Sequence, residues 1–182
     1  MSSTKTPEDG ETGAVPRSPI VSSAHLAAGE SPALSEVEFG LILAGHAFSR
    51  WMVQCMAAAG YPGLSPVEIL ILHTVRHRSR PKRLAHICLV LDIEDTHLAT
   101  YAIRKLERAQ LVKTGREGKE KTVSATELGV AACKRYHEIR EALLVRSVSR
   151  SGISEASLSD LAGLLRVLSG YYDQGARAAA TM

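Results

Sequence analysis

The chain has 182 residues, of which 45% are hydrophobic and only 4% aromatic, and its formal net charge is +3. This length suits one globular domain with tails, and the scarcity of aromatic residues indicates a core of Leu, Ile, Val and Ala, which favours helices. No apolar run approaches the roughly 18 residues of a membrane-spanning helix, so we expect no membrane segment.

The positive charge is concentrated in the middle of the chain. Residues 61–125 carry twelve Lys and Arg against seven Asp and Glu, whereas residues 1–60 carry three against six. A basic segment between acidic or nearly neutral flanks favours one surface that binds a polyanion, although a merely solubilising basic surface is the alternative.

Residues 1–33 are rich in Ser, Pro, Gly, Thr and Ala without a periodic apolar stripe, which predicts a disordered tail. Residues 34–60 repeat apolar side chains at steps of three and four, which predicts a long amphipathic helix. The sequence Gly60-Tyr61-Pro62-Gly63 ends it, because Gly and Pro interrupt helices.

Residues 61–125 contain three short helical patterns. The first begins with Ser65-Pro66-Val67-Glu68, in which Ser caps the helix and Glu closes a capping box. The second opens at Lys82-Arg83-Leu84-Ala85, after Pro81. The third, at about residues 95–109, follows a turn of carboxylates and has a predicted buried face of Ala99, Ala102, Ile103 and Leu106.

A predicted β-hairpin follows the third helix. Leu111-Val112 and Val123 are strand-like, and Gly118 allows the chain to reverse between them. Three helices followed by a hairpin is the order of a winged helix-turn-helix, which places one helix in the major groove of DNA. The sequence therefore predicts a mainly α fold with a small β-hairpin wing.

Two further helices are predicted at about residues 126–148 and 158–172, the first capped by Thr126, and residues 177–182 are expected to fray. A winged unit does not need the segments 34–60 and 126–176 for its own core. We therefore predict that they are dimerisation helices joining two copies of the chain, the alternative being that they pack on their own chain.

The pattern resembles the MarR family of bacterial transcriptional regulators over about residues 35–172. The likeness lies in Leu64-Ser65-Pro66, in Lys82-Arg83-Leu84-Ala85, and in residues 105–112 and 123–129, with sequences KLERAQLV and VSATELG. The resemblance implies a single domain over 34–176, a homodimer that binds double-stranded DNA, and release by small phenolic or oxidant signals.

The predicted DNA contacts fall into two groups. The exposed face of the helix at 95–109 offers groups that read base edges or bind phosphates. They are Thr96, His97, Thr100, Tyr101 and Arg104. Two basic clusters supply backbone contacts, one before the second helix and one in the wing. They are Arg80, Lys82 and Arg83, and Arg116, Lys119 and Lys121.

Two alternatives remain open at this point. Glu117 and Glu120 offset the charge of the wing, which favours a winged-helix protein-interaction module without DNA binding. A ligand-switched or redox-switched sensor is the other. A small-molecule pocket between the first long helix and the winged unit would be lined by His46, Trp51, Met52 and His73.

The cysteines Cys55, Cys88 and Cys133 are an odd number at wide spacing, which predicts free thiols in a reducing cytoplasm. We expect them to be small buried side chains, with Cys133 the strongest redox alternative because Lys134 and Arg135 follow it. His73 and His77 have metal-capable spacing but no matching ligands. The sequence predicts no metal, no cofactor and no enzymatic activity.

Overall fold

The computed structural model describes residues 18–182, so the first half of the predicted tail, residues 1–17, lies outside the described residues. The chain divides into two compact units, one up to Ser49 and one from Arg50 onward. The described part of the predicted tail contains a short 3-10 helix, η1 (Ala24–Ala28). The boundary between the units falls inside the first long helix.

That helix, α1, spans Pro32–Ala58 and so matches the predicted element closely. Its last turns carry Met52, Cys55 and Met56 into the core of the second unit, where each is at most 4% exposed. In the first unit the predicted apolar face of α1 stays open, and Phe48 is 54% exposed.

Helix α2 (Pro66–Arg76) begins with the predicted capping box. The backbone N–H of Ser65 donates to Glu68 Oε2 at 2.7 Å, and the Ser65 hydroxyl accepts from the N–H of Glu68 at 3.4 Å. The box satisfies backbone donors at the helix start that have no partner within the helix.

The second predicted helix starts two residues later than expected. Lys82–Arg83 forms a strand, β1, after a 3-10 turn, η2 (His77–Ser79), and helix α3 (Leu84–Leu91) follows it. The physical reason is non-local, because Lys82 and Arg83 pair antiparallel with Val123 and Thr122. The predicted two-stranded wing is therefore a three-stranded sheet.

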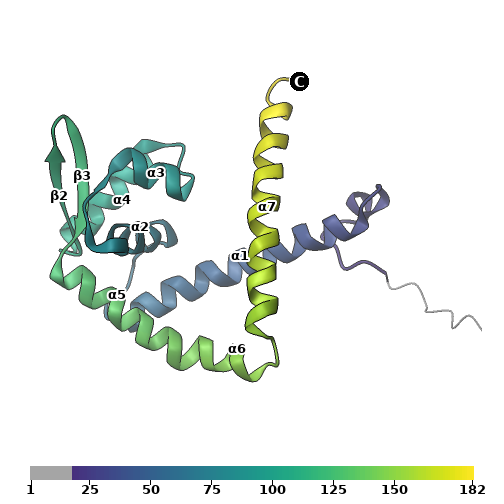
Figure 1. Ribbon diagram of the computed structural model, residues 1–182, viewed down its shortest axis with the longest axis horizontal. Coiled ribbons are helices and arrows are strands. Elements are labelled where there is room, and N and C mark those ends of the chain that lie inside the picture. Colours follow the sequence, from purple (N-terminus) through teal and green to yellow (C-terminus); the bar gives the residue numbers. More distant parts are fainter. Residues whose placement is uncertain (1–17) are drawn as a thin grey trace, which may run out of the picture. The chain divides into compact units, whose positions relative to one another are not determined.

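Helix α4 (Thr96–Arg108) confirms the third predicted helix, with Asp95 Oδ1 accepting from the N–H of His97 at 2.8 Å. Its four predicted core residues, Ala99, Ala102, Ile103 and Leu106, are all buried. The strands β2 (Val112–Glu117) and β3 (Glu120–Ala125) follow, in the sheet order β1-β3-β2. Figure 1 shows the hairpin beside α3 and α4, with α2 beneath them.

One apolar core joins α2, α3, α4, the sheet and the end of α1. Its most buried side chains are aliphatic, as the low aromatic content predicts; they include Ile69, Ile71, Leu72, Val75, Ile87, Ile103, Leu106, Leu111 and Val123. This packing fixes α4 within the unit, because close-packed side chains leave little room for a helix to shift.

The chain continues as α5 (Glu127–Arg140), a π-helical turn, η3 (Glu141–Val145), α6 (Arg146–Arg150) and α7 (Glu155–Ala179). Thr126 caps α5, as predicted, through a 3.0 Å bond from the N–H of Gly129. Helix α7 continues into the segment expected to fray and has no buried residue. Among residues 18–182, none of the helices is long and apolar enough to cross a membrane.

Gly129 in the first turn of α5 tests the packing of this unit. A Cβ at this position would meet the carbonyl oxygen of Leu111 and lie 3.3 Å from Leu72 Cδ1. We expect Gly129→Ala to lower the free energy of unfolding by about 1–3 kcal/mol in urea titrations. Gly170→Ala in α7, where the Cβ meets nothing within 4 Å, is the control and should not destabilise. Equal stability of the Gly129 variant and the parent would contradict the packing described.

Candidate nucleic-acid interface

The face of α4 opposite its buried stripe is open to solvent. Thr96, His97, Tyr101 and Arg104 are exposed, and Thr100 is half-buried. The structure therefore places all five predicted α4 contacts on one accessible helix face. Leu98, 48% exposed, lies next to this set and was not predicted.

Hydrogen bonds hold the end of α4 to the wing. Glu107 Oε1 accepts from the hydroxyl of Thr114 at 2.6 Å and from its backbone N–H at 3.1 Å. A second tie holds α4 to the start of α2, because Lys105 Nζ lies 2.9 Å from the buried carboxylate of Glu68 and donates to Gly63 O at 2.7 Å. These bonds hold α4 to the wing and to the start of α2.

The register of the hairpin separates the charges of the wing. Arg116 lies opposite Lys121, and Glu117 lies opposite Glu120. Since paired residues project from the same face and neighbours along a strand project from opposite faces, one face is basic and the other acidic. Thr114 is two residues before Arg116, so the basic face is the one that turns toward α4.

Lys119 completes this basic face of the wing. It lies in the turn beside Gly118, whose φ of 62° is left-handed. Arg116, Lys119 and Lys121 line one shallow pocket of about 500 Å³ together with Thr114 and Gly115. The structure therefore brings the three predicted wing cations together.

The two wing glutamates are engaged on the other face. Arg83 Nε lies 3.3 Å from Glu117 Oε2 and 2.7 Å from Glu120 Oε2. These exposed pairs are weak individually, but they place the acidic residues away from the basic face. They also partly occupy Arg83, which was predicted to contact a phosphate.

Lys82, also predicted to contact a phosphate, is only 5% exposed. Its ammonium donates to the carbonyl oxygens of His77 at 2.7 Å and Arg80 at 3.2 Å. Burial, with Arg80 and Arg78 nearby, lowers the pKa of Lys82 below its usual value. Arg80 itself is exposed.

The four residues of the predicted ligand pocket have different environments. Met52 is buried in the core, and His46 is exposed on α1. The rings of His73 and Tyr136 meet edge to face with centroids 4.7 Å apart, and Trp51 hydrogen-bonds Tyr136. Tyr136 thus joins two of the predicted residues and was itself not among the predicted pocket residues.

His73 is the member of this group with an unused polar atom. Its Nε2 is buried and has no hydrogen-bond partner among residues 18–182. Burial lowers the pKa of His73, which favours the neutral imidazole. No group of three or more His, Cys, Asp or Glu in this part of the chain is placed to hold a metal ion.

All three cysteines are free and buried in the described chain, as predicted. Burial raises the pKa of the Cys55 thiol, and it raises the pKa of Cys133 to about 11 in spite of the opposing effect of Arg76. A raised thiol pKa disfavours the thiolate, which is the reactive form. The geometry therefore does not support a redox role at Cys133.

The raised pKa of Cys133 predicts a pH dependence of stability. The folded protein holds this proton more tightly than the unfolded chain, so its contribution is complete below pH 9 and is lost as the pH rises to about 11. We expect the free energy of unfolding to fall across this window. The free energy of unfolding of the Cys133→Ala variant should fall less steeply over the same pH range. Parallel curves for the variant and the parent would contradict the assignment.

Comparisons with known proteins agree with this geometry. Residues 64–129 match the family described as winged helix DNA-binding domain. No curated protein sequence matches the chain. The matched segment contains α2, α3, α4 and the wing, so the central unit is a winged helix-turn-helix domain.

Solved structures match over a longer stretch. A MarR-family transcriptional regulator from Rhodococcus sp. RHA1 has 14% identity and a TM-score of 0.61, over 73% of this chain and 91% of that one. A mutant MarR from E. coli complexed with operator DNA has 13% identity and a TM-score of 0.62, over 77% and 98%.

CouR from Rhodococcus jostii RHA1, bound to p-coumaroyl-CoA, has 14% identity and a TM-score of 0.57, over 72% of this chain and 90% of that one. At such identities the likeness defines the fold. The structural neighbours of this chain across most of its length are MarR-family regulators, and the predicted fold class, a winged helix-turn-helix with long flanking helices, is confirmed.

Proposed function

We propose that the chain is a sequence-specific DNA-binding transcriptional regulator that inserts α4 into the major groove. One observation carries this proposal: the exposed face of α4 lies beside the basic face of the wing. The bond between Glu107 and Thr114 holds the two elements together. A helix with exposed donors beside a cationic ribbon is suited to reading bases with one element and holding phosphates with the other.

Each exposed group on α4 has a suitable partner on DNA. Arg104 and His97 donate hydrogen bonds to guanine N7 or O6, the commonest base contacts. Thr100 and Thr96 serve bases or phosphates, and Tyr101 binds a phosphate or a thymine methyl group. Arg80, Arg116, Lys119 and Lys121 hold the backbone, whereas Lys82 uses two of its three N–H groups in internal bonds.

DNA selected from a random pool by the purified protein supplies the probe for the test. In fluorescence anisotropy, Arg104→Gln should weaken binding to the selected site by about 1–3 kcal/mol and relax the preference at one base pair. Arg116→Gln should weaken selected and random DNA alike and reduce the log–log salt slope by about 0.9.

Arg166→Gln is the matched control. It removes the same charge from α7, a helix that is distant from α4 in the sequence, and should leave DNA binding unchanged. Absence of binding to any duplex at low salt would favour the alternative of a protein-interaction module. Equal loss of affinity in the Arg104 and Arg166 variants would remove Arg104 from the base-reading set.

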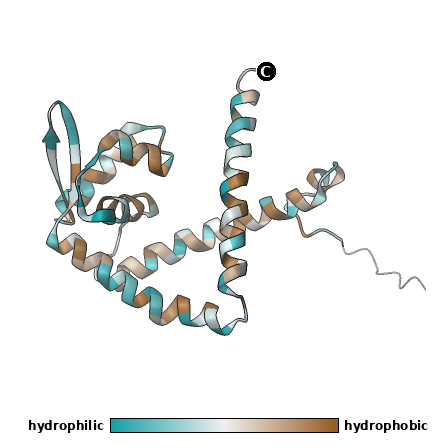
Figure 2. Cartoon of the chain, in the orientation of Figure 1, coloured by the Kyte–Doolittle hydropathy of each residue, from teal (hydrophilic) through white to brown (hydrophobic). Residues whose placement is uncertain are grey.

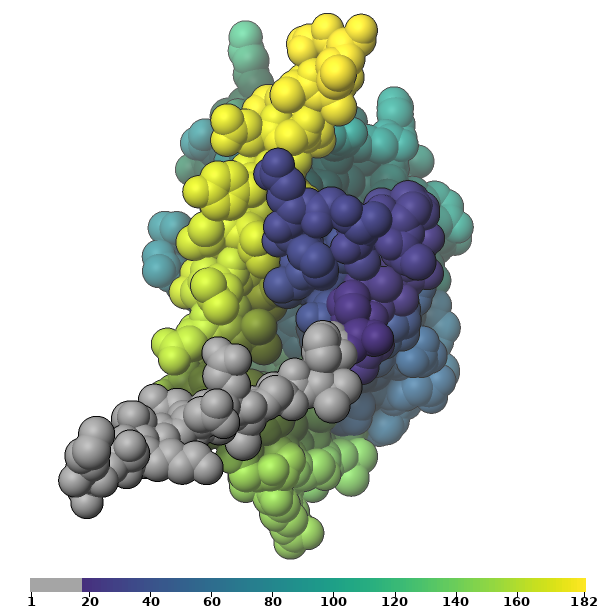
Figure 3. Space-filling view, turned by 90° about the vertical axis from the view of Figure 1, so that its right-hand side faces the viewer, coloured from purple at the N-terminus to yellow at the C-terminus, as the bar shows by residue number. Residues whose placement is uncertain are grey.

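We further propose that α1, α5, α6 and α7 join two copies of the chain. Figure 2 shows apolar segments along α7, and its side chains stand at the surface in Figure 3. The exposed fractions are 52% for Leu161, 63% for Leu164 and 58% for Val167. A stripe of exposed leucines on one helix face is typical of a protein interface, and a second copy supplies a matching stripe.

Adding a charge to this stripe tests the dimer. Leu164→Glu should shift the protein toward a monomer in sedimentation experiments and weaken DNA binding, because one chain contacts only a half-site. Ser159→Glu adds the same charge on the opposite face of α7 and should remain dimeric. A monomeric parent protein at micromolar concentration would rule out this assembly.

A small-molecule effector is the remaining part of the proposal. CouR was crystallised with p-coumaroyl-CoA, and the group of Trp51, Tyr136 and His73 offers this chain an aromatic wall and the unused Nε2 of His73. A neutral imidazole nitrogen suits the hydroxyl of a phenolic ligand.

The proposed action on DNA, together with three free thiols, supports a cytoplasmic location for the protein.

A further inference from the structure

A basic pocket beside the wing includes two residues proposed above to hold the DNA backbone, Arg80 and Arg116. It has a volume of about 710 Å³ and lies between β1, the start of α3 and the wing. It is lined by Arg80, Pro81, Lys82, Arg83, His86, Arg116, Glu117 and Thr122. A second hollow of about 500 Å³ shares three of these side chains, those of Arg80, Lys82 and His86.

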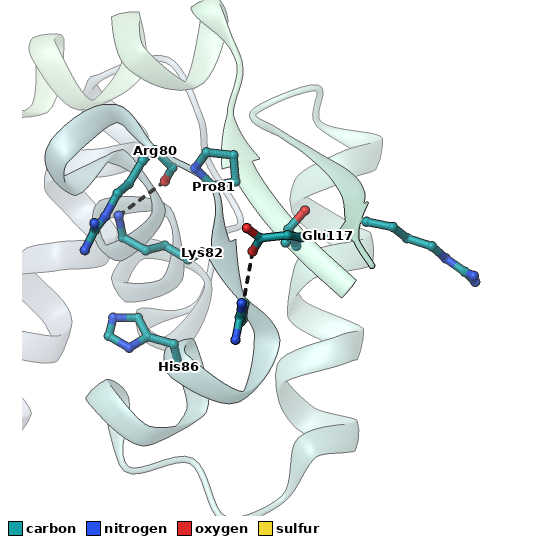
Figure 4. Close-up of a pocket in the computed structure, with 8 residues that line it drawn as sticks. Arg80, Pro81, Lys82, His86 and Glu117 are labelled. Atoms are coloured by element: carbon teal, nitrogen blue, oxygen red, sulfur yellow. Dashed lines mark hydrogen bonds and ion pairs between the residues drawn. The ribbon is translucent and has the colours of Figure 1, made fainter. Parts of the chain in front are cut away.

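Figure 4 shows Arg80, Lys82 and His86 grouped at one end of the basic pocket and Glu117 across from them. Glu117 is the only carboxylate among the described residues that line it, and it is held by Arg83. No ion pair within residues 18–182 includes Arg80 or Lys82. Two cations therefore lie together without a neutralising acid.

The ammonium of Lys82 has one hydrogen-bond donor left. It carries three N–H groups, of which two donate to the carbonyls of His77 and Arg80. The side chain is nine-tenths buried, and a buried cation without a counter-charge is costly. An anion in the pocket would accept the third N–H and relieve the repulsion between Lys82 and Arg80.

The loop around Lys82 is built to keep this arrangement. Arg78 and Ser79 both have left-handed backbone, with φ of 60° and 48°, which non-glycine residues rarely adopt. The hydroxyl of Ser79 accepts from Arg76 Nη1 at 2.8 Å. A strained loop that wraps its carbonyls around one ammonium fixes the position of that ammonium, as a binding site requires.

We propose that Arg80, Lys82 and His86 form a binding site for a phosphate group. Arg80 supplies a planar set of donors, Lys82 supplies its third N–H, and a ring nitrogen of His86 supplies another. Two uncompensated cations favour the higher charge of a phosphate over that of a carboxylate. The phosphate belongs either to a small molecule or to the DNA backbone. The second of these sources rests on the proposed function, whereas binding of free phosphate can be measured without DNA.

The test is an NMR titration of the whole chain with inorganic phosphate, at an ionic strength kept constant with chloride. We expect saturable shifts confined to residues 76–86 and the neighbouring wing. Arg80→Gln and His86→Gln, both at exposed positions, should each weaken binding about tenfold, the loss of one charge-assisted hydrogen bond. Lys113→Gln removes an exposed cation elsewhere on the wing and should bind phosphate like the parent.

A second arm identifies the source of the phosphate. If a selected DNA duplex displaces inorganic phosphate from these residues, the site holds a backbone phosphate; if both bind at once, it serves a phosphate-bearing small molecule. Shifts that never saturate, or that are the same in the parent and in the Arg80 and His86 variants, would overturn the proposal. DNA binding by the same protein preparation would show that this failure leaves the proposed function intact.

Discussion

The bonds from Thr114 to the carboxylate of Glu107 set the geometry of the whole candidate interface. They join strand β2 of the wing to the last turn of α4. Because Thr114 faces α4, alternation along the strand sends Arg116 to the same side. This carboxylate thus ties the basic face of the ribbon to α4, on the side where Val123, the partner of Thr114, is buried.

Local patterns in the sequence predicted most of the fold. The stripe from Ala99 to Leu106 follows a helical period, and the capping box needs only four consecutive residues, so both were correct. Strand β1 was missed because two residues cannot display a strand period, and its partners lie forty residues away in β3. The burial of Lys82 was missed for another reason: the nearby carbonyl oxygens of His77 and Arg80, and no acidic side chain, hold its ammonium, and backbone carbonyls leave no signal in the sequence.

The sequence predicted which residues form the candidate interface better than it predicted how they are arranged. The five α4 residues share a face because they are spaced along one helix. The separation of charges in the wing was also predictable, since Arg116 and Glu117 are neighbours and so are Glu120 and Lys121. The contact between Thr114 and Glu107, which brings the basic face toward α4, was not. Tyr136 was overlooked because an aromatic residue in a helical stripe indicates a core position, and nothing local links it to Trp51 and His73.

The alternating register of the wing has a consequence for how this protein can change through evolution. Inserting one residue into either strand would exchange the two sides of the ribbon beyond that point and turn its carboxylates toward α4. Inserting two residues would lengthen the ribbon and keep its polarity. Relatives that retain this mode of recognition should therefore differ in strand length by even steps, with odd changes confined to the turn at Gly118.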